Sequence, residues 1–96
     1  MRQGTTPTHA FTLPAGIDAT EASEIVVTYR QGETVIDKTP TVETASLLKL
    51  TLTQEETMKF EVGNVCIQVA MSFEGVPVMR SNIVNDRVYA ALGGAI

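Results

Sequence analysis

The sequence contains a single cysteine, Cys66, and a single histidine, His9, among its 96 residues. One cysteine excludes a disulfide within the chain, and a reducing compartment fits that composition. A structural zinc site usually has four Cys or His ligands, so these two residues are too few for one. We therefore predict no metal site, with Cys66 packed as a small apolar residue and His9 an ordinary exposed or edge-strand residue.

Aromatic and basic residues are also scarce. The chain has no tryptophan, two tyrosines and three phenylalanines, which leaves little to build a sugar-stacking cleft or a platform for nucleic-acid bases. Its seven lysines and arginines are scattered, whereas contact with a phosphate backbone depends on clustered cations. The formal net charge of −4 permits binding to a basic protein surface. We predict no nucleic-acid partner.

Signatures of catalysis, cofactor binding and membrane insertion are missing from the sequence. The pair Gly93-Gly94 stands at the end of the chain with no helix after it, so it cannot place a phosphate at a helix N-terminus. No window approaches the roughly 20 apolar residues that span a bilayer. We therefore predict a protein that is not an enzyme, has no cofactor and does not enter a membrane.

Short segments of alternating apolar and polar residues dominate what is present, and this pattern predicts β-strands. The clearest is Asn64–Glu74, in which every second residue from Val65 to Phe73 is apolar. In Ser23–Gln31 the core face is predicted to carry Ile25, Val27 and Tyr29. Other strands are expected at Thr8–Leu13, Glu33–Lys38, Thr44–Leu52, Val76–Met79 and Ser81–Leu92.

Two segments admit a helix. Thr53 and Glu56 have the spacing of a capping box, which predicts a helical turn over Gln54–Lys59, with Met58 and Phe60 as the candidates to point inward. Asp18–Ala22 fits either a helical turn or a loop. The leucine-rich Thr44–Leu52 also admits a helix, although its strict alternation favours a strand.

These elements predict an all-β fold, an antiparallel Ig-like β-sandwich of about six or seven strands with one short helical turn. A small barrel has the same sequence pattern. A parallel sheet is disfavoured because each crossover needs a dozen or more residues. The chain is expected to form a single domain over residues 1–96, with residues 1–7 as a flexible N-terminal arm and residues 93–96 as a loose tail.

Four segments carry a resemblance to a known group of proteins: MRQGTTPTHAFTLP, VTYRQGETVIDKT, LTLTQEETMKF and SNIVNDRVYAAL, in that order along the chain. The layout resembles small proteins from the structural-gene regions of tailed phages and prophages of gut Firmicutes. It is also weakly similar to the Ig-like N-terminal module of siphophage upper baseplate proteins. These motifs are turns and strand patterns, and no catalytic residue is transferred from them.

The resemblance implies a non-enzymatic structural or assembly protein that makes protein–protein contacts in a phage tail, baseplate or related virion assembly. Its partners would be other phage structural proteins, and it would form a homo-oligomer in the assembly. It would be made in the bacterial cytoplasm and located in the virion. The alternative function is a small acidic phage-encoded inhibitor that occludes a host defence or regulatory protein.

The expected contact regions are the N-terminal arm, the tip of the first hairpin and the C-terminal part of the chain. The arm could add a strand to the sheet edge of a neighbouring subunit or lie along it. A frayed terminus is the alternative explanation of the arm. The residues predicted to bind a partner are Arg2, Thr5, Thr6, Thr8, Gln31, Gly32, Tyr89 and Leu92.

Overall fold

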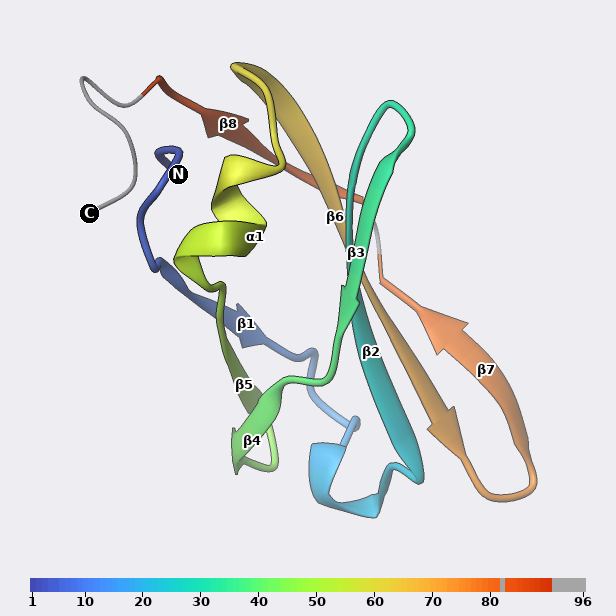
Figure 1. Cartoon of the computed structure of the whole chain (residues 1–96). Helices are drawn as coiled ribbons and strands as arrows, with labels where there is room; N and C mark the ends of the chain where they lie inside the picture. Colours follow the sequence, from blue (N-terminus) through green and yellow to red (C-terminus); the bar gives the residue numbers. More distant parts are fainter. Residues whose placement is uncertain (82, 91–96) are drawn as a thin grey trace.

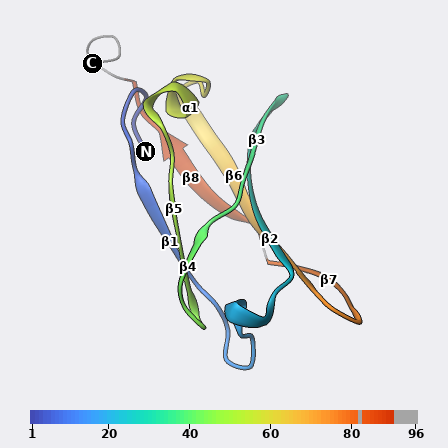
Figure 2. The same ribbon diagram turned by 60° about the horizontal axis from the view of Figure 1, so that its bottom comes forward.

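The computed structural model describes residues 1–81 and 83–90 as two antiparallel β-sheets that face each other (Figures 1 and 2). The smaller sheet has the order β1-β5-β4, and the larger has the order β3-β2-β6-β7 with β8 also paired to β6. The predicted antiparallel β-sandwich is confirmed, with eight strands rather than about six or seven. Their bounds are β1 Thr8–Thr12, β2 Glu24–Gln31, β3 Thr34–Lys38, β4 Thr41–Thr44, β5 Leu47–Thr51, β6 Gly63–Phe73, β7 Val76–Arg80 and β8 Val84–Val88.

The strands divide between the sheets as in an immunoglobulin-type sandwich, apart from β2. An immunoglobulin domain places its second strand in the sheet of the first, fourth and fifth strands. Here β2 lies between β3 and β6 in the larger sheet. The smaller sheet is therefore left with three strands. The larger sheet is four strands wide, because β7 and β8 both pair with the same edge of β6.

The core lies between the two sheets and follows the predicted alternation closely. On β6 the side chains of Val65, Ile67, Val69 and Met71 are all buried, as expected from their period of two. The predicted core face of β2 is buried in the same way. Across the sandwich the buried core comprises Ala19, Ile25, Val27, Tyr29, Ile36, Leu48, Leu50, Leu52, Phe60, Val65, Ile67, Val69, Met71 and Val88.

Strand β6 organises the larger sheet because it is long enough to have three partners. One edge of β6 pairs with β2, and the other pairs with β8 near Gly63–Ile67 and with β7 near Ala70–Phe73. β7 and β8 thus form two successive halves of one sheet margin. The predicted last strand at Ser81–Leu92 is observed as β8, and the tail predicted for residues 93–96 lies outside the described residues.

The strand predicted within Thr44–Leu52 is confirmed as β5, but it begins later than expected, and the preceding strand β4 was not predicted. β4 ends at Thr44, the chain turns at Ala45 and Ser46, and β5 begins at Leu47. Two hydrogen bonds stabilise this turn. The Ser46 N–H donates to Thr44 Oγ1 at 3.3 Å, and the Leu13 N–H donates to the Ser46 carbonyl at 2.8 Å. The helical alternative for this segment is also excluded.

The predicted capping box is confirmed. The Glu56 N–H donates to Thr53 Oγ1 at 3.1 Å, and Glu56 Oε1 accepts from the Thr53 N–H at 2.7 Å. The helix α1 that follows spans Gln54–Met58. The prediction that Met58 points inward is wrong, since its side chain is 43% exposed. Thr57 is buried instead, and its hydroxyl donates to the Thr5 carbonyl at 2.8 Å, while Phe60 is buried as predicted.

A 3-10 turn at Ala19–Glu21 resolves the ambiguous segment before β2. Asp18 caps it by accepting a hydrogen bond from the Thr20 N–H at 2.9 Å, and Ala19 is buried in the core. Helix α1 and this turn lie at opposite ends of the space between the sheets (Figures 1 and 2). They close the two ends of the sandwich and leave its sides to the edge strands.

Candidate functional site

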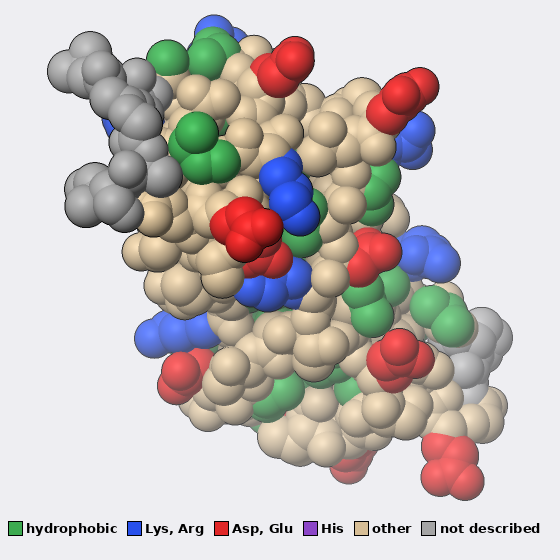
Figure 3. All heavy atoms as spheres, in the orientation of Figure 1, with side chains coloured by type: hydrophobic (Ala, Val, Ile, Leu, Met, Phe, Trp, Pro, Cys, Tyr) green, Lys and Arg blue, Asp and Glu red, His purple; other side chains and the backbone are tan. Residues whose placement is uncertain are grey.

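Charged side chains of both signs are interspersed over the face shown in Figure 3, and hydrophobic side chains appear between them in small separate groups. The distribution of lysines and arginines on this face agrees with their scattering along the sequence. Lys38 is held by Glu56, with 2.8 Å between Nζ and Oε1. This face offers no concentration of positive charge of the kind that phosphate backbones attract.

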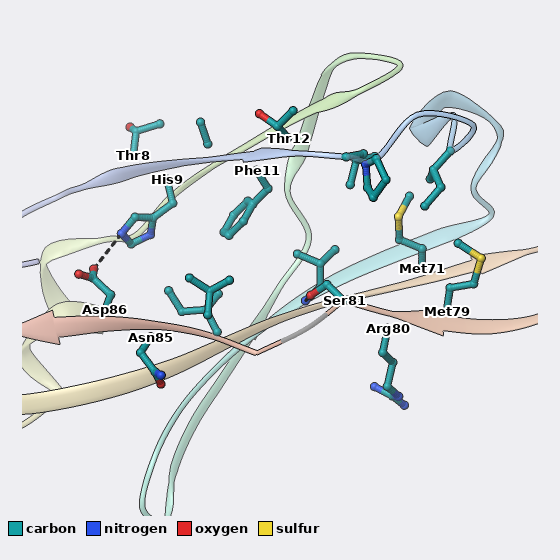
Figure 4. A pocket seen from close by; sticks show the side chains of 17 residues that line it. Thr8, His9, Phe11, Thr12, Met71, Met79, Arg80, Ser81, Asn85 and Asp86 are labelled. Atoms are coloured by element: carbon teal, nitrogen blue, oxygen red, sulfur yellow. Dashed lines mark hydrogen bonds and ion pairs between the residues drawn. The ribbon is translucent and has the colours of Figure 1, made fainter.

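An open cleft of about 800 Å³ lies between β1 and the margin of the larger sheet (Figure 4). β1 forms one wall, and β6, β7 and β8 form the other. The cleft follows from the unequal sheet widths: the short link from β3 to β4 aligns the sheets on one side, so β4, β5 and β1 lie opposite β3, β2 and β6. The apolar residues that line it include Phe11, Leu13, Ile17, Ile67, Val69, Met71, Met79 and Val84.

Val84 shows how incompletely the larger sheet is covered. Its partner in the ladder is the buried Ile67, and paired residues point to the same face, so Val84 faces the interior of the sandwich. Its side chain is nevertheless 57% exposed. Met79, paired with the buried Met71, also faces inward and is partly exposed. The inner surface of β7 and β8 is therefore apolar and open to solvent.

A polar cluster closes one end of the cleft. The Tyr29 hydroxyl lies 2.8 Å from His9 Nδ1, and His9 Nε2 lies 3.4 Å from Asp86 Oδ2. Asp86 Oδ2 also accepts from the Met1 ammonium group at 3.2 Å. With a neutral imidazole, the tyrosine hydroxyl donates to Nδ1 and the Nε2–H donates to the carboxylate. The cluster joins β1, β2 and β8, as Figure 4 shows for His9 and Asp86.

Burial controls how these groups titrate. Desolvation lowers the pKa of His9 below its ordinary value and outweighs the opposing effect of Asp86. Burial also raises the pKa of Tyr29. For Asp86, burial acts to raise the pKa, but hydrogen bonds from the Met1 ammonium group and the Arg87 N–H outweigh it and the pKa is lowered. Near neutral pH the cluster therefore consists of a neutral tyrosine, a neutral imidazole and a carboxylate.

Cys66 does not take part in this cluster, and the prediction that it packs as a buried apolar residue is wrong. It alternates with the buried residues of β6, so its side chain lies on the outer face of the larger sheet and is exposed. Its Sγ lies 3.3 Å from Asn85 Oδ1 on the neighbouring strand β8. The two ring nitrogens of His9 contact Tyr29 and Asp86, so the geometry provides no thiol activated by an imidazole.

The N-terminal residues lie along their own domain. Arg2 forms a bridge with Tyr89, its guanidinium donates to the Ala90 carbonyl at 2.7 Å, and it lies 5.6 Å from the centre of the Tyr89 ring. The Thr5 hydroxyl donates to the Arg2 carbonyl at 2.6 Å. Thr6, like these residues, is exposed to solvent. The structure thus brings Arg2 and Tyr89 together, next to the end of β8.

The remaining predicted contact residues lie elsewhere. Gln31 is partly buried against Glu61. Its side-chain amide donates to the Glu61 carbonyl at 2.8 Å and accepts from the Glu61 N–H at 2.7 Å. Gly32 is exposed at the hairpin tip with a φ of +59°, which glycine adopts without strain. Thr8 is exposed on β1, with its hydroxyl 2.7 Å from that of Thr51. Leu92 lies outside the described residues.

Comparison with known proteins found no family model that matches the chain and no similar curated protein. In residues 1–81 and 83–90, no three or more His, Cys, Asp or Glu side chains are grouped so that they could hold a metal ion. Within the same part of the chain, the helices are too short and too polar to cross a bilayer.

Proposed function

We propose that this chain is a non-enzymatic assembly protein that acts through protein–protein contact. The observation that supports this most is the open inner surface of β7 and β8, where Val84 faces the core and is still 57% exposed. Other large apolar side chains are exposed in the same part of the chain, at Val78, Ile83 and Tyr89. Apolar surface that a fold leaves uncovered commonly marks an interaction site.

The proposed setting is the tail, baseplate or a related assembly of a tailed phage, with other phage structural proteins as partners. Support for this setting comes from the resemblance in the four segments quoted above. In a symmetric particle, repeated copies of one modest contact add up through multivalency. Contacts of the exposed arm residues Arg2, Thr5 and Thr6, and of Tyr89, with a neighbour are part of the same proposal.

Mass spectrometry of phage particles, purified from a strain that produces them, tests the proposal. A structural protein is expected in the particles in many copies and at a constant ratio to the other virion proteins. Absence of the chain from intact particles would contradict the proposal. Co-purification with one host protein from infected cells, in a complex that salt dissociates, would instead support the inhibitor.

A further inference from the structure

β1 differs from the other strands at the sheet margins in having no protection against pairing with a further strand. Natural edge strands are usually protected by charged residues, proline or bulges. β1 has the sequence THAFT, with no formally charged residue, no proline and a regular register with β5. The other margins are protected by Asp37 and Lys38 on β3, Glu43 and a register shift on β4, Pro77 and Arg80 on β7, and Asp86 and Arg87 on β8.

The backbone of β1 has groups directed away from its sheet, and none of the residues that the structure describes pairs with them. The Leu13 N–H donates to Ser46 at 2.8 Å, and the Leu52 N–H donates to Pro7 at 3.0 Å. Residues of an antiparallel strand alternate between facing one neighbour and the other, so the odd-numbered residues of β1 bond to β5. The N–H and C=O groups of Thr8, Ala10 and Thr12 therefore point towards the free edge, and all three residues are exposed.

A strand added beside β1 would lie over the cleft. The smaller sheet is one strand narrower than the larger one, and the uncovered surface belongs to β7 and β8. Every second side chain of an added strand would point inward, towards Phe11 on β1 and towards Met79 and Val84 on the opposite wall. Figure 4 shows the Phe11, Met71 and Met79 side chains directed into this space. The inward positions therefore require apolar side chains.

Charge specifies the outward side of the added strand. Lys49 lies beside Ala10 in the ladder, is exposed, and forms no ion pair with any residue that the structure describes. An added strand runs about 10 Å from β5, a distance that a lysine and a glutamate can bridge across a residue as small as Ala10. Asp86, in the cleft, already contacts the Met1 ammonium group and His9. The unmatched charge is thus positive, and an acidic side chain opposite Ala10 complements it.

A second copy of this chain fits the edge less well. Antiparallel pairing of two β1 strands about their centre would place Ala10 of one copy against Ala10 of the other and leave both Lys49 side chains unmatched. It would also bring together two chains that each carry a formal net charge of −4. An extended segment of a different protein meets both requirements.

We propose that β1 accepts an extended segment of a partner protein as an added strand, with alternate apolar side chains in the cleft and an acidic side chain beside Lys49. The proposal rests on the protein-contact function above and identifies its surface. The mode of binding is β-augmentation, in which backbone hydrogen bonds provide affinity and alternate side chains provide specificity. The sequence predicts an arm that adds a strand to a neighbour's sheet edge or lies along it, whereas in this proposal the folded domain accepts the strand.

The test uses an acetylated and amidated peptide, GSVTVEVTVSG, whose palindromic core presents the same side chains in either strand direction. NMR titration of the full chain is expected to shift and protect the amides of Thr8, Ala10 and Thr12. Replacing the central glutamate of the peptide by lysine should weaken binding about two- to fivefold, as for an exposed ion pair. In the Lys49→Glu variant this preference should reverse.

The Ala10→Pro variant removes an outward N–H while leaving the bonds to β5 intact, and should weaken peptide binding at least about tenfold. Ala10→Ser keeps the N–H and is the matched control.

Peptide binding that is absent, or unaffected by both Ala10→Pro and Lys49→Glu, would overturn the inference. So would a dimer in light scattering that Ala10→Pro dissociates, because a second copy would then occupy the edge. Virion incorporation unchanged in both variants would overturn the inference and leave the protein-contact function standing.

Discussion

At the scale of single residues, the cluster of His9, Tyr29 and Asp86 joins three strands through side chains distant in sequence. Tyr29 is fully buried, so its hydroxyl depends on His9 Nδ1 for its hydrogen bond. An unsatisfied buried hydroxyl would destabilise the fold by about 1–3 kcal/mol. The sequence showed Tyr29 on a core face but gave no sign of its partner, because no local pattern relates residues 20 positions apart.

His9 predicts how stability depends on pH. Its pKa in the folded state lies below the unfolded value near 6.5, so between these two values the unfolded chain binds a proton that the folded chain does not. The stability associated with His9 is therefore complete above about pH 6.5 and is lost as the pH falls towards the folded pKa. The groups that face His9 are the Tyr29 hydroxyl and the Asp86 carboxylate, and that carboxylate also contacts the Met1 ammonium group.

Urea unfolding at pH 7.5, 6.5 and 5.5 measures this effect. The free energy of unfolding should fall with pH over this range in the natural sequence, and the fall should be smaller in His9→Gln. An equal pH dependence in both proteins would show that His9 is not buried in the neutral form.

Glu56 and Glu55 provide a matched pair on one helix. Glu56 accepts from the Thr53 N–H at 2.7 Å and from Lys38 Nζ at 2.8 Å, whereas Glu55 is exposed. We expect Glu56→Gln to lower the free energy of unfolding by about 1 kcal/mol at pH 7 and Glu55→Gln to change it by less than about 0.5 kcal/mol. Chemical denaturation checks this, and equal effects would contradict the contribution assigned to the Glu56 carboxylate and its contact with Lys38.

The pH dependence of the Glu56 effect follows from its pKa. Burial acts to raise that pKa, but hydrogen bonds from Lys38 and Thr53 lower it below 4.5. The stabilisation is therefore present above the unfolded pKa and is lost as the pH falls through the folded one. The difference between the natural sequence and Glu56→Gln should narrow below about pH 4.5.

At the scale of elements, the strands with strict alternation were predictable. β2 and β6 alternate over their whole length, and burial of one row decides their orientation. The turn between β4 and β5 was missed because Ala45 and Ser46 include no glycine, proline or asparagine to mark it. Cys66 was misplaced for a different reason: alternation identifies two faces of a strand, but not whether the second face is covered.

The adjacent leucines of β5 test the register directly. Leu48 is fully buried between the sheets, whereas Leu47 points to the opposite face and is only partly buried. We expect Leu48→Ala to lower the free energy of unfolding by about 2–5 kcal/mol, the usual cost of a cavity in a core. Leu47→Ala should cost clearly less. A reversed order in urea denaturation would mean that β5 is shifted by one residue.

At the scale of the whole molecule, the two sheets have unequal widths, and the candidate site is a consequence. The sequence predicted a sandwich with no catalytic centre, but the cleft depends on which strands become neighbours. Placement of β2 beside β6 rather than beside β1 leaves the smaller sheet narrow and the inner surface of β8 open. Pairings between strands tens of residues apart decide this, and no motif in the sequence records them.

The central claim is that β1 is an open edge, paired on one side only. Residue-resolved amide hydrogen exchange along residues 8–13 of the free protein tests it most directly. The amides of His9, Phe11 and Leu13, which face β5, should exchange slowly, and those of Thr8, Ala10 and Thr12 should exchange rapidly. Slow exchange at all six amides would show that the edge is already covered and would contradict the account.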